Sequence, residues 1–309
     1  MRHFLDIDQI DCTDLRSIIN DALNLKAQRS GFTKGQLDRN ASLEGNSVAL
    51  IFQKPSTRTR VSFDIGVHQL GGKSLLLSGD DMQLGHGETI GDTALVLSRY
   101  VDLMMLRTFS GETLYEMAKH ASIPVINGLT DASHPCQIMA DILTYEEKRG
   151  SIKGKKVLWI GDGNNVCTSL IQASVKFNFS VIFSGPDELD PDPILVKKVL
   201  KHGANFKIQR DVKEAIKDVD LIITDSWVSM HHSALQRKSL HNTLQQYQVN
   251  KELIKYSKPD TLFMHCLPAH RGEEVTSEVL DGKRSVVFDE AENRLHVQKS
   301  IMRWCLNKF

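Results

Sequence analysis

The chain has 309 residues and a mass of 34.7 kDa, which is enough for two domains of ordinary size. Its 38 Lys and Arg residues balance 38 Asp and Glu residues, so the formal net charge is zero. This balance argues against a nucleic-acid partner, because nucleic-acid-binding surfaces usually leave a basic excess. No apolar run approaches the ~20 residues of a membrane-spanning helix, so we expect no membrane partner.

The cysteines indicate a reducing compartment. Their odd number and wide spacing, without a Cys-x-x-Cys pair, are typical of free thiols rather than of a disulfide framework. They are Cys12, Cys136, Cys167, Cys266 and Cys305. The first eight residues turn acidic at once and lack the apolar stretch of a signal peptide. We therefore expect a cytoplasmic protein.

The first half of the chain alternates short apolar runs with stretches of helical period, as βαβ units do. Apolar positions 15, 18, 19, 22 and 23 predict an amphipathic helix near the start. Strands are predicted at 47–52, 74–77, 103–106 and 125–126. Helices are predicted at 61–70, ending at Gly71-Gly72, and near 90–100 and 111–121.

A polar, glycine-bearing stretch at 149–155 marks the expected domain boundary, with one domain at 1–148 and a second at 149–292. Beyond it, strands are predicted at 156–160, 181–183, 221–224, 261–265 and 286–288. Helices are predicted near 166–178, 192–202, 211–217 and 251–257, with a last helix at 293–307. The expected fold class is α/β, with two parallel β-sheets, each flanked by helices.

Ligands of open α/β sheets bind beyond the carboxyl ends of the strands. After the strand at 47–52, Pro55 ends the strand and Ser56 is a good helix N-cap. Thr57–Arg60 then form a first helical turn whose free N–H groups favour anions. Arg58 and Arg60 add cations there, so we expect a phosphate or carboxylate site. The GxxxxGK[ST] spacing of a nucleotide-binding P-loop is absent.

Polar residues also follow the next two strands of this half. Arg107 ends the strand at 103–106, and His134-Pro-Cys-Gln137 opens a helix after the strand at 125–126. His134 alone would be weak evidence, because a histidine near a helix start can act as a cap. Three strand ends that each carry anion-binding or polar groups favour one ligand site.

Together these motifs resemble the aspartate/ornithine carbamoyltransferase family, in which such a trio forms the carbamoyl phosphate site. In the second half, 161–165 (GDGNN), 225–230 (DSWVSM) and 265–268 (HCLP) are similar to the members that act on ornithine. The members that act on aspartate would show a Pro-Leu-Pro-Arg type of loop in place of the last motif. The resemblance runs over nearly the whole chain.

The resemblance implies transfer of the carbamoyl group from carbamoyl phosphate to the side-chain amine of L-ornithine, giving L-citrulline and phosphate. Direct attack without a covalent intermediate is expected, within arginine metabolism, and the sequence leaves the biosynthetic or catabolic direction open. It also implies a homotrimer with sites at subunit interfaces, a final helix, 293–309, that crosses back to the first domain, and no metal or other cofactor. The first domain would bind carbamoyl phosphate and the second ornithine.

The site residues that the resemblance implies form two sets. The carbamoyl phosphate set is Ser56, Thr57, Arg58, Thr59, Arg60, Gln83, Arg107, His134, Gln137, Cys266, Leu267 and Arg294. Gln83 would reach a neighbouring subunit's site. The ornithine set is Asn165, Asp225, Ser229 and Met230. Cys266, Arg107 and His134 are the candidate catalytic residues.

Two positions depart from the family pattern. Gln53 stands where Glu is common, and His231-His232 follows Met230 where glycine is usual. In the family that loop closes over the amino acid, so added side chains bear on substrate identity or loop kinetics. The histidine pair lacks further ligands at zinc-like spacing, and an exposed loop pair is the favoured interpretation.

Cys266 has three possible roles: as a covalent nucleophile, in positioning the amine and accepting its proton, or as a purely structural residue. A nucleophile would need a base, and the neighbouring His265 should point to the opposite face at a strand end. The non-covalent role is therefore favoured.

Other functions remain as alternatives. A dehydrogenase would need the third glycine of GxGxxG, where Val166 stands, and an acidic residue after the strand at 181–183. A binding-only relative would need only the first domain's residues. The nearest rival is transfer to another amine, such as putrescine or an acylated ornithine.

Overall fold

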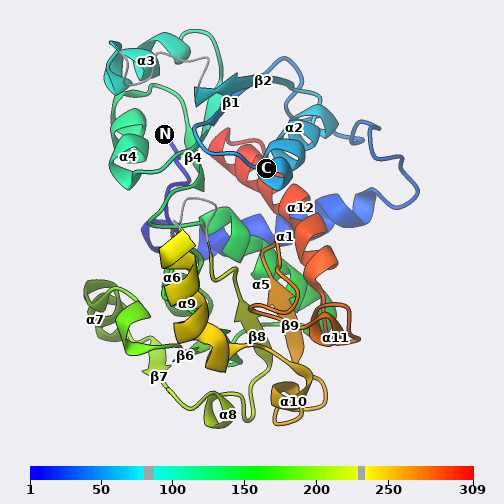
Figure 1. The fold of residues 1–309 in the computed structure, drawn as a ribbon. Helices are drawn as coiled ribbons and strands as arrows, with labels where there is room; N and C mark the ends of the chain where they lie inside the picture. Colours follow the sequence, from blue (N-terminus) through cyan, green and yellow to red (C-terminus); the bar gives the residue numbers. More distant parts are fainter. Residues whose placement is uncertain (80–86, 229–233) are drawn as a thin grey trace. The chain divides into compact units, whose positions relative to one another are not determined.

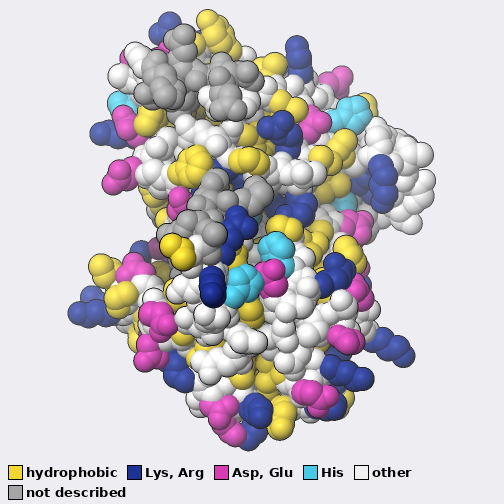
Figure 2. Space-filling view, viewed as in Figure 1, with side chains coloured by type: hydrophobic (Ala, Val, Ile, Leu, Met, Phe, Trp, Pro, Cys, Tyr) yellow, Lys and Arg dark blue, Asp and Glu magenta, His cyan; other side chains and the backbone are white. Residues whose placement is uncertain are grey.

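The computed structural model describes residues 1–79, 87–228 and 234–309. The chain divides into two compact units (Figure 1). Unit 1 comprises Met1–Leu143 with Glu292–Phe309, and unit 2 comprises Thr144–Ala291. Basic and acidic side chains are interspersed over the face seen in Figure 2, in keeping with the zero net charge.

Unit 1 is built on a four-stranded sheet in the order β2-β1-β3-β4, and every pairing is parallel. The strands are β1 (Ser47–Phe52), β2 (Lys73–Ser78), β3 (Leu103–Arg107) and β4 (Val125–Leu129). The inner strands β1 and β3 are almost wholly apolar and buried, as expected for parallel strands covered on both faces. The edge strand β2 is partly exposed.

Helices cover this sheet. They are α1 (Cys12–Gln28), α2 (Thr57–Gln69), α3 (Ile90–Leu97), α4 (Gly111–His120) and the first part of α5 (Pro135–Arg149), with a short 3-10 helix, η1, at Ile7–Gln9. The core between β3 and α4 includes Met104, Leu106, Leu114 and Met117, all fully or nearly fully buried.

The last helix, α12 (Val287–Cys305), joins unit 1 from Glu292 onward. The ammonium of Lys299 is buried 2.6 Å from Oδ2 of Asp38 and donates to Oε1 of Gln69 at 2.9 Å. Ser300 donates to the carbonyl of Ile18 in α1 at 2.8 Å. These contacts hold residues from the two ends of the sequence together, as the predicted crossing of the final helix requires.

Unit 2 contains a five-stranded parallel sheet in the order β7-β6-β5-β8-β9. Its strands are β5 (Lys156–Ile160), β6 (Ser180–Ser184), β7 (Asn205–Ile208), β8 (Leu221–Thr224) and β9 (Leu262–His265). Its helices are α6 (Asn165–Phe177), α7 (Pro193–Lys201), α8 (Val212–Ala215), α9 (Ala234–Leu244), α10 (Lys251–Ile254) and α11 (Ser277–Leu280), with short 3-10 helices η3 (Asp187–Leu189) and η4 (Gln245–Tyr247). The predicted fold class is confirmed.

The predicted strand at 286–288 is wrong. Ser285 makes only an isolated bridge to Phe263, and Val287 begins α12. The β-branched run favours a strand locally, but helical hydrogen bonds replace the ladder there, such as Glu290 N to Val286 O at 2.9 Å. The edge strand β7 was not predicted, because of its four residues only Phe206 is buried.

Within the part of the chain that the structure describes, no helix is both long and apolar enough to cross a membrane.

Candidate active site

The strand order of unit 1 brings three of the predicted motifs together. Strands β1, β3 and β4 are neighbours, and their carboxyl ends lead into Ser56, Arg107 and His134. The chain runs to β2 on one side of β1 and to β3 on the other, so the order reverses between β1 and β3. Such a reversal is where open α/β sheets bind ligands.

The start of α2 has the geometry of an anion-binding turn. Ser56 has extended backbone, and its hydroxyl accepts a hydrogen bond from the Thr59 N–H at 3.2 Å. Other N–H groups of this first turn have no partner within the helix, and the helix dipole is positive here. Arg58 is half-buried, whereas Arg60 is exposed, with its guanidinium 5.0 Å from the ring centre of Phe52.

Thr59 links three elements of unit 1. Its side chain is fully buried. Its Oγ1 accepts a hydrogen bond from Nη2 of Arg294 at 2.7 Å and a longer one from Nη1 of Arg107 at 3.5 Å. Arg107 ends β3, and Arg294 comes from α12. The final helix therefore supplies a cation to the site at the start of α2.

His134 is buried, and its pKa lies well below the ordinary value because of burial and the nearby charges of Arg294, Arg107 and Arg58. The imidazole is therefore neutral at physiological pH and has one N–H to donate. Asn127 of β4 fixes the preceding turn, since its amide donates to the Ser133 hydroxyl at 3.0 Å.

Gln137 lies one turn into α5 and is fully buried. Its Nε2 donates to Oδ1 of Asp141 at 2.9 Å. This bond orients the amide of Gln137 within the helix. Across the sheet, the Thr108 hydroxyl donates to Oε1 of Gln53, so the glutamine that departs from the family pattern connects the ends of β3 and β1.

Unit 2 repeats this arrangement at β5, β8 and β9, which are also neighbours. After β5, Gly161 has a φ of +132°, and a Cβ on Gly163 would lie 2.4 Å from the backbone nitrogen of Pro191. Both positions thus require glycine for reasons of backbone shape. Val166, at the place of a third glycine in a dinucleotide-binding turn, is a buried residue of α6.

Asn164, which sequence reasoning did not single out, connects two acidic residues of unit 2. It caps α6 by accepting hydrogen bonds from Val166 N and Cys167 N. Its Nδ2 donates to Oδ2 of Asp225 at 2.9 Å and to Oδ1 of Asp162 at 3.3 Å. The predicted Asn165 is the first residue of α6. The signal available in the sequence was an N-cap residue directly before the helix.

The two carboxyl groups joined by Asn164 influence each other. Burial and the charge of Asp225 raise the pKa of Asp162 to about 7. Near neutral pH about half of the Asp162 side chains are therefore protonated and uncharged.

Cys266 follows β9, and its Sγ lies 2.9 Å from Oδ1 of Asp225. One side-chain oxygen, nitrogen or sulfur atom from each of Asp225, His265 and Cys266 lies within 4.8 Å of the other two. The side chains of His265 and Cys266 are thus closer together than the alternation of side chains along a strand predicts. No Cys–His pair forms, because His265 Nδ1 accepts from Leu267 N at 2.9 Å and Nε2 lies 3.2 Å from Glu274 Oε1.

Leu267 is a non-glycine residue with left-handed backbone, at a φ of +57°. This conformation costs roughly 1–3 kcal/mol and is often found at binding sites. The hydrogen bond from Leu267 N to His265 holds it there. The peptide bond that follows, to Pro268, is cis.

Three predicted residues, Gln83, Ser229 and Met230, lie outside the described residues, as does the His231-His232 pair. Their assigned roles remain predictions.

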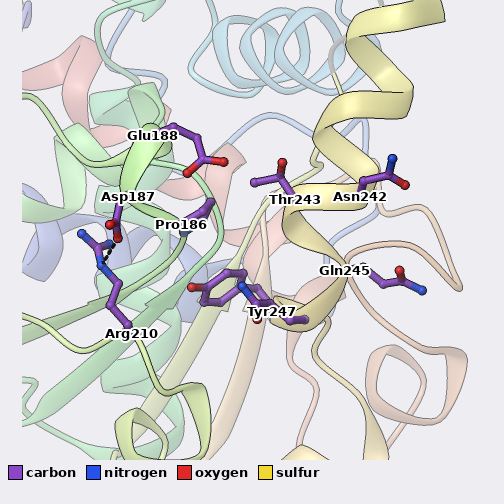
Figure 3. A pocket seen from close by; sticks show the side chains of 9 residues that line it. Pro186, Asp187, Glu188, Arg210, Asn242, Thr243, Gln245 and Tyr247 are labelled. Carbon is purple, nitrogen blue, oxygen red and sulfur yellow. Dashed lines mark ion pairs between the residues drawn. The ribbon is translucent and has the colours of Figure 1, made fainter.

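A depression among the described residues of unit 2 opens beyond β6 and contains none of the predicted site residues (Figure 3). Arg210 points into it but is already paired. Its Nε lies 2.7 Å from Asp187 Oδ1, and its Nη1 lies 2.6 Å from Asp190 Oδ1. The described residues of unit 2 that were predicted for the site follow β5, β8 and β9 instead.

Comparison with known proteins assigns the family. Residues 2–147 match the model for the carbamoyl-P binding domain of aspartate/ornithine carbamoyltransferase, and residues 153–305 match its Asp/Orn binding domain. The chain belongs to the aspartate/ornithine carbamoyltransferase family. The resemblance inferred from the motifs is confirmed.

Full-length relatives agree with this assignment. The chain is 59% identical over 306 residues to an ornithine carbamoyltransferase of Cereibacter sphaeroides, covering 99% of each chain. Among solved structures, an ornithine carbamoyltransferase from Pyrococcus furiosus has a TM-score of 0.92 and 45% identity, over 98% of this chain and 96% of that one. One from Burkholderia thailandensis has a TM-score of 0.89 and 41% identity, over 99% of both chains.

We expect the Asp162→Asn variant to lose less stability than the wild-type protein as the pH rises. The raised pKa means that this group's stabilisation is complete below the ordinary carboxyl pKa and is lost as the pH rises through about 7. Asparagine cannot ionise and keeps the shape that Asn164 contacts. Denaturant unfolding at a series of pH values between about 5 and 8 measures the difference.

The exposed Asp260→Asn variant of unit 2 is the control and should follow the wild-type curve. Identical pH dependence of the Asp162→Asn variant and the wild-type protein would contradict the raised pKa.

Proposed function

We propose that the protein transfers the carbamoyl group of carbamoyl phosphate to the side-chain amine of L-ornithine, giving L-citrulline and phosphate. The observation that carries this proposal is the 59% identity, over 99% of both chains, to a protein named ornithine carbamoyltransferase. The polar groups at the strand ends of each unit supply the chemistry that this reaction needs.

Unit 1 binds carbamoyl phosphate. The phosphate lies at the start of α2. Backbone N–H groups and the hydroxyls of Ser56 and Thr57 donate hydrogen bonds to it, and Arg58 and Arg60 neutralise its charge. The Thr59 hydroxyl accepts from two guanidinium groups, so its own hydrogen is available to the ligand.

The carbamoyl group is polarised by Arg107 and His134, with Gln137 and Arg294 beside them. Negative charge develops on the carbamoyl oxygen as the amine attacks. A neutral imidazole donates one hydrogen bond to that oxygen without adding a cation next to three arginines. Each such donor contributes roughly 3 kcal/mol in comparable sites.

Unit 2 binds ornithine. Asp225 accepts hydrogen bonds from the α-ammonium group. Asn165, Ser229 and Met230 also contribute to ornithine binding. The raised pKa of Asp162 lowers the negative charge of that side chain beside Asp225 near neutral pH. Asn164 holds both carboxyl groups in place.

Cys266 and Leu267 act at the side-chain amine, whose pKa of ~10 requires loss of a proton before attack. The Cys266 thiol faces a carboxylate, and both nitrogens of His265 are engaged by other groups. Because the thiol donates to Asp225, Cys266 positions the amine and relays its proton: the amine proton passes to Sγ as the thiol proton passes to the Asp225 carboxylate. The amine attacks carbamoyl phosphate directly.

We also propose a homotrimer in which Gln83 contributes to a neighbouring subunit's site. Exposed apolar side chains on β2 and α3 support a subunit contact on unit 1, because such residues mark interfaces where they gather. They are Leu75, Leu76, Leu95 and Val96. All five cysteines are free thiols, which supports the cytoplasmic location. The product, L-citrulline, places the reaction in arginine metabolism.

The function is tested by assaying carbamoyl transfer to ornithine, putrescine, N-acetylornithine and aspartate. We expect strong preference for ornithine. Preference for another amine would contradict ornithine as the substrate, and the roles assigned to residues 225–232 would then be the ones in error. Carbamoyl phosphate binding without transfer to any amine would favour a binding-only protein.

We expect Cys266→Ala to lower turnover roughly 100-fold, the scale of a lost proton-transfer group. Its affinity for carbamoyl phosphate should stay nearly unchanged, because the phosphate is bound by unit 1. Steady-state kinetics and calorimetry measure the two quantities. Cys12→Ala, at an exposed cysteine that begins α1, is the control and should match the wild type. Wild-type kinetics in Cys266→Ala would refute its role.

A further inference from the structure

A second cluster of ligand-type side chains lies on the loop after β9, apart from the residues assigned to carbamoyl phosphate and ornithine. His270, Glu273 and Glu274 each offer one nitrogen or oxygen atom, and these atoms lie within 4.8 Å of one another. Figure 2 shows histidine (cyan) and acidic (magenta) side chains side by side on the viewed face.

Glu274 is the buried member of this cluster, with a fully buried side chain. Its Oε1 is engaged by the backbone N–H of His270 and lies 3.2 Å from His265 Nε2. Its Oε2 is also buried but accepts no hydrogen bond from any described residue. A buried carboxylate oxygen without a donor is costly, so this atom points to an additional ligand.

The geometry around this oxygen fits a metal ion. Oε2 of Glu274 lies 3.6 Å from Nδ1 of His270, beyond hydrogen-bond distance. Two ligands of a tetrahedral ion with bonds of ~2.1 Å lie about 3.4 Å apart. The side chains of His270 and Glu273 are 43% and 38% exposed, which leaves a path for the ion and for a bound water.

The carboxylate ligands also have supporting partners, as metal ligands usually do. His265 lies against Oε1 of Glu274, as described above. His241 Nε2 lies 3.3 Å from Oε2 of Glu273 and packs edge-on against Trp227. Gln248 Nε2 donates to the backbone carbonyl of Glu273 at 2.8 Å. These contacts fix the loop from several elements of unit 2.

We propose that His270, Glu273 and Glu274 bind a divalent transition-metal ion, with one imidazole and two carboxylates as ligands and water completing the site. Zn²⁺ suits this donor set and a tetrahedral geometry. The site is structural rather than catalytic. The site is connected to Leu267 by His265. One ring nitrogen of His265 contacts Glu274, and the other accepts a hydrogen bond from the Leu267 N–H. A bound ion therefore stabilises the loop that carries Cys266.

The test titrates Zn²⁺ into chelator-treated full-length protein by calorimetry. The Cys266→Ala background removes a thiol ligand from the other group of donor atoms, Asp225, His265 and Cys266. We expect binding of about one ion per chain with a rise in melting temperature. His270→Ala and Glu273→Gln, each in this background, should weaken binding roughly 100-fold. His241→Ala removes only a supporting contact and should weaken it about tenfold.

The exposed His202→Ala variant is the matched control and should keep the parent affinity. Because His270 and Glu273 are partly exposed, we expect their variants to fold. Turnover of the single variants, with Cys266 retained and without metal, verifies this. Absence of Zn²⁺ binding, or unchanged affinity in His270→Ala or Glu273→Gln, would overturn the proposal.

Discussion

The anion site of unit 1 depends on one buried hydroxyl. Thr59 sits in the first turn of α2 and accepts hydrogen bonds from Arg107 of β3 and Arg294 of α12. Two guanidinium groups would otherwise repel each other and the positive end of the helix dipole. Their convergence there indicates a site shaped for an anion, with the cations held in position before the ligand binds.

The same constraint explains why the final helix belongs to unit 1. Arg294 lies 235 positions from Thr59 in sequence, so only a helix that packs against α1 and α2 can deliver it. The buried ammonium of Lys299, paired with Asp38, fixes the rotation of that helix. In unit 2 the corresponding element is Asn164, which holds Asp162 and Asp225 together at the ends of β5 and β8.

Much of this organisation was predictable from the sequence. Apolar runs identified nearly all strands, and polar residues at their ends identified the site motifs, because parallel strands end at a common edge. Long-range contacts were not predictable from spacing. Arg294 was assigned to the carbamoyl phosphate set only through the family resemblance, and its hydrogen bond to Thr59 was not predicted. The bridge made by Asn164 was also missed, because the resemblance pointed to its neighbour Asn165. The strand prediction at 286–288 was wrong because this run of high strand propensity forms the start of α12.

The most direct test of this account is carbamoyl phosphate binding to Thr59→Val, measured by calorimetry. The substitution keeps the shape but removes the acceptor of both guanidinium groups and a donor to the ligand. We predict a loss of about 2 kcal/mol, roughly thirtyfold in affinity. Thr13→Val, at an exposed threonine of α1, should bind as the wild type does. Unchanged affinity in Thr59→Val would contradict the central role of this hydroxyl.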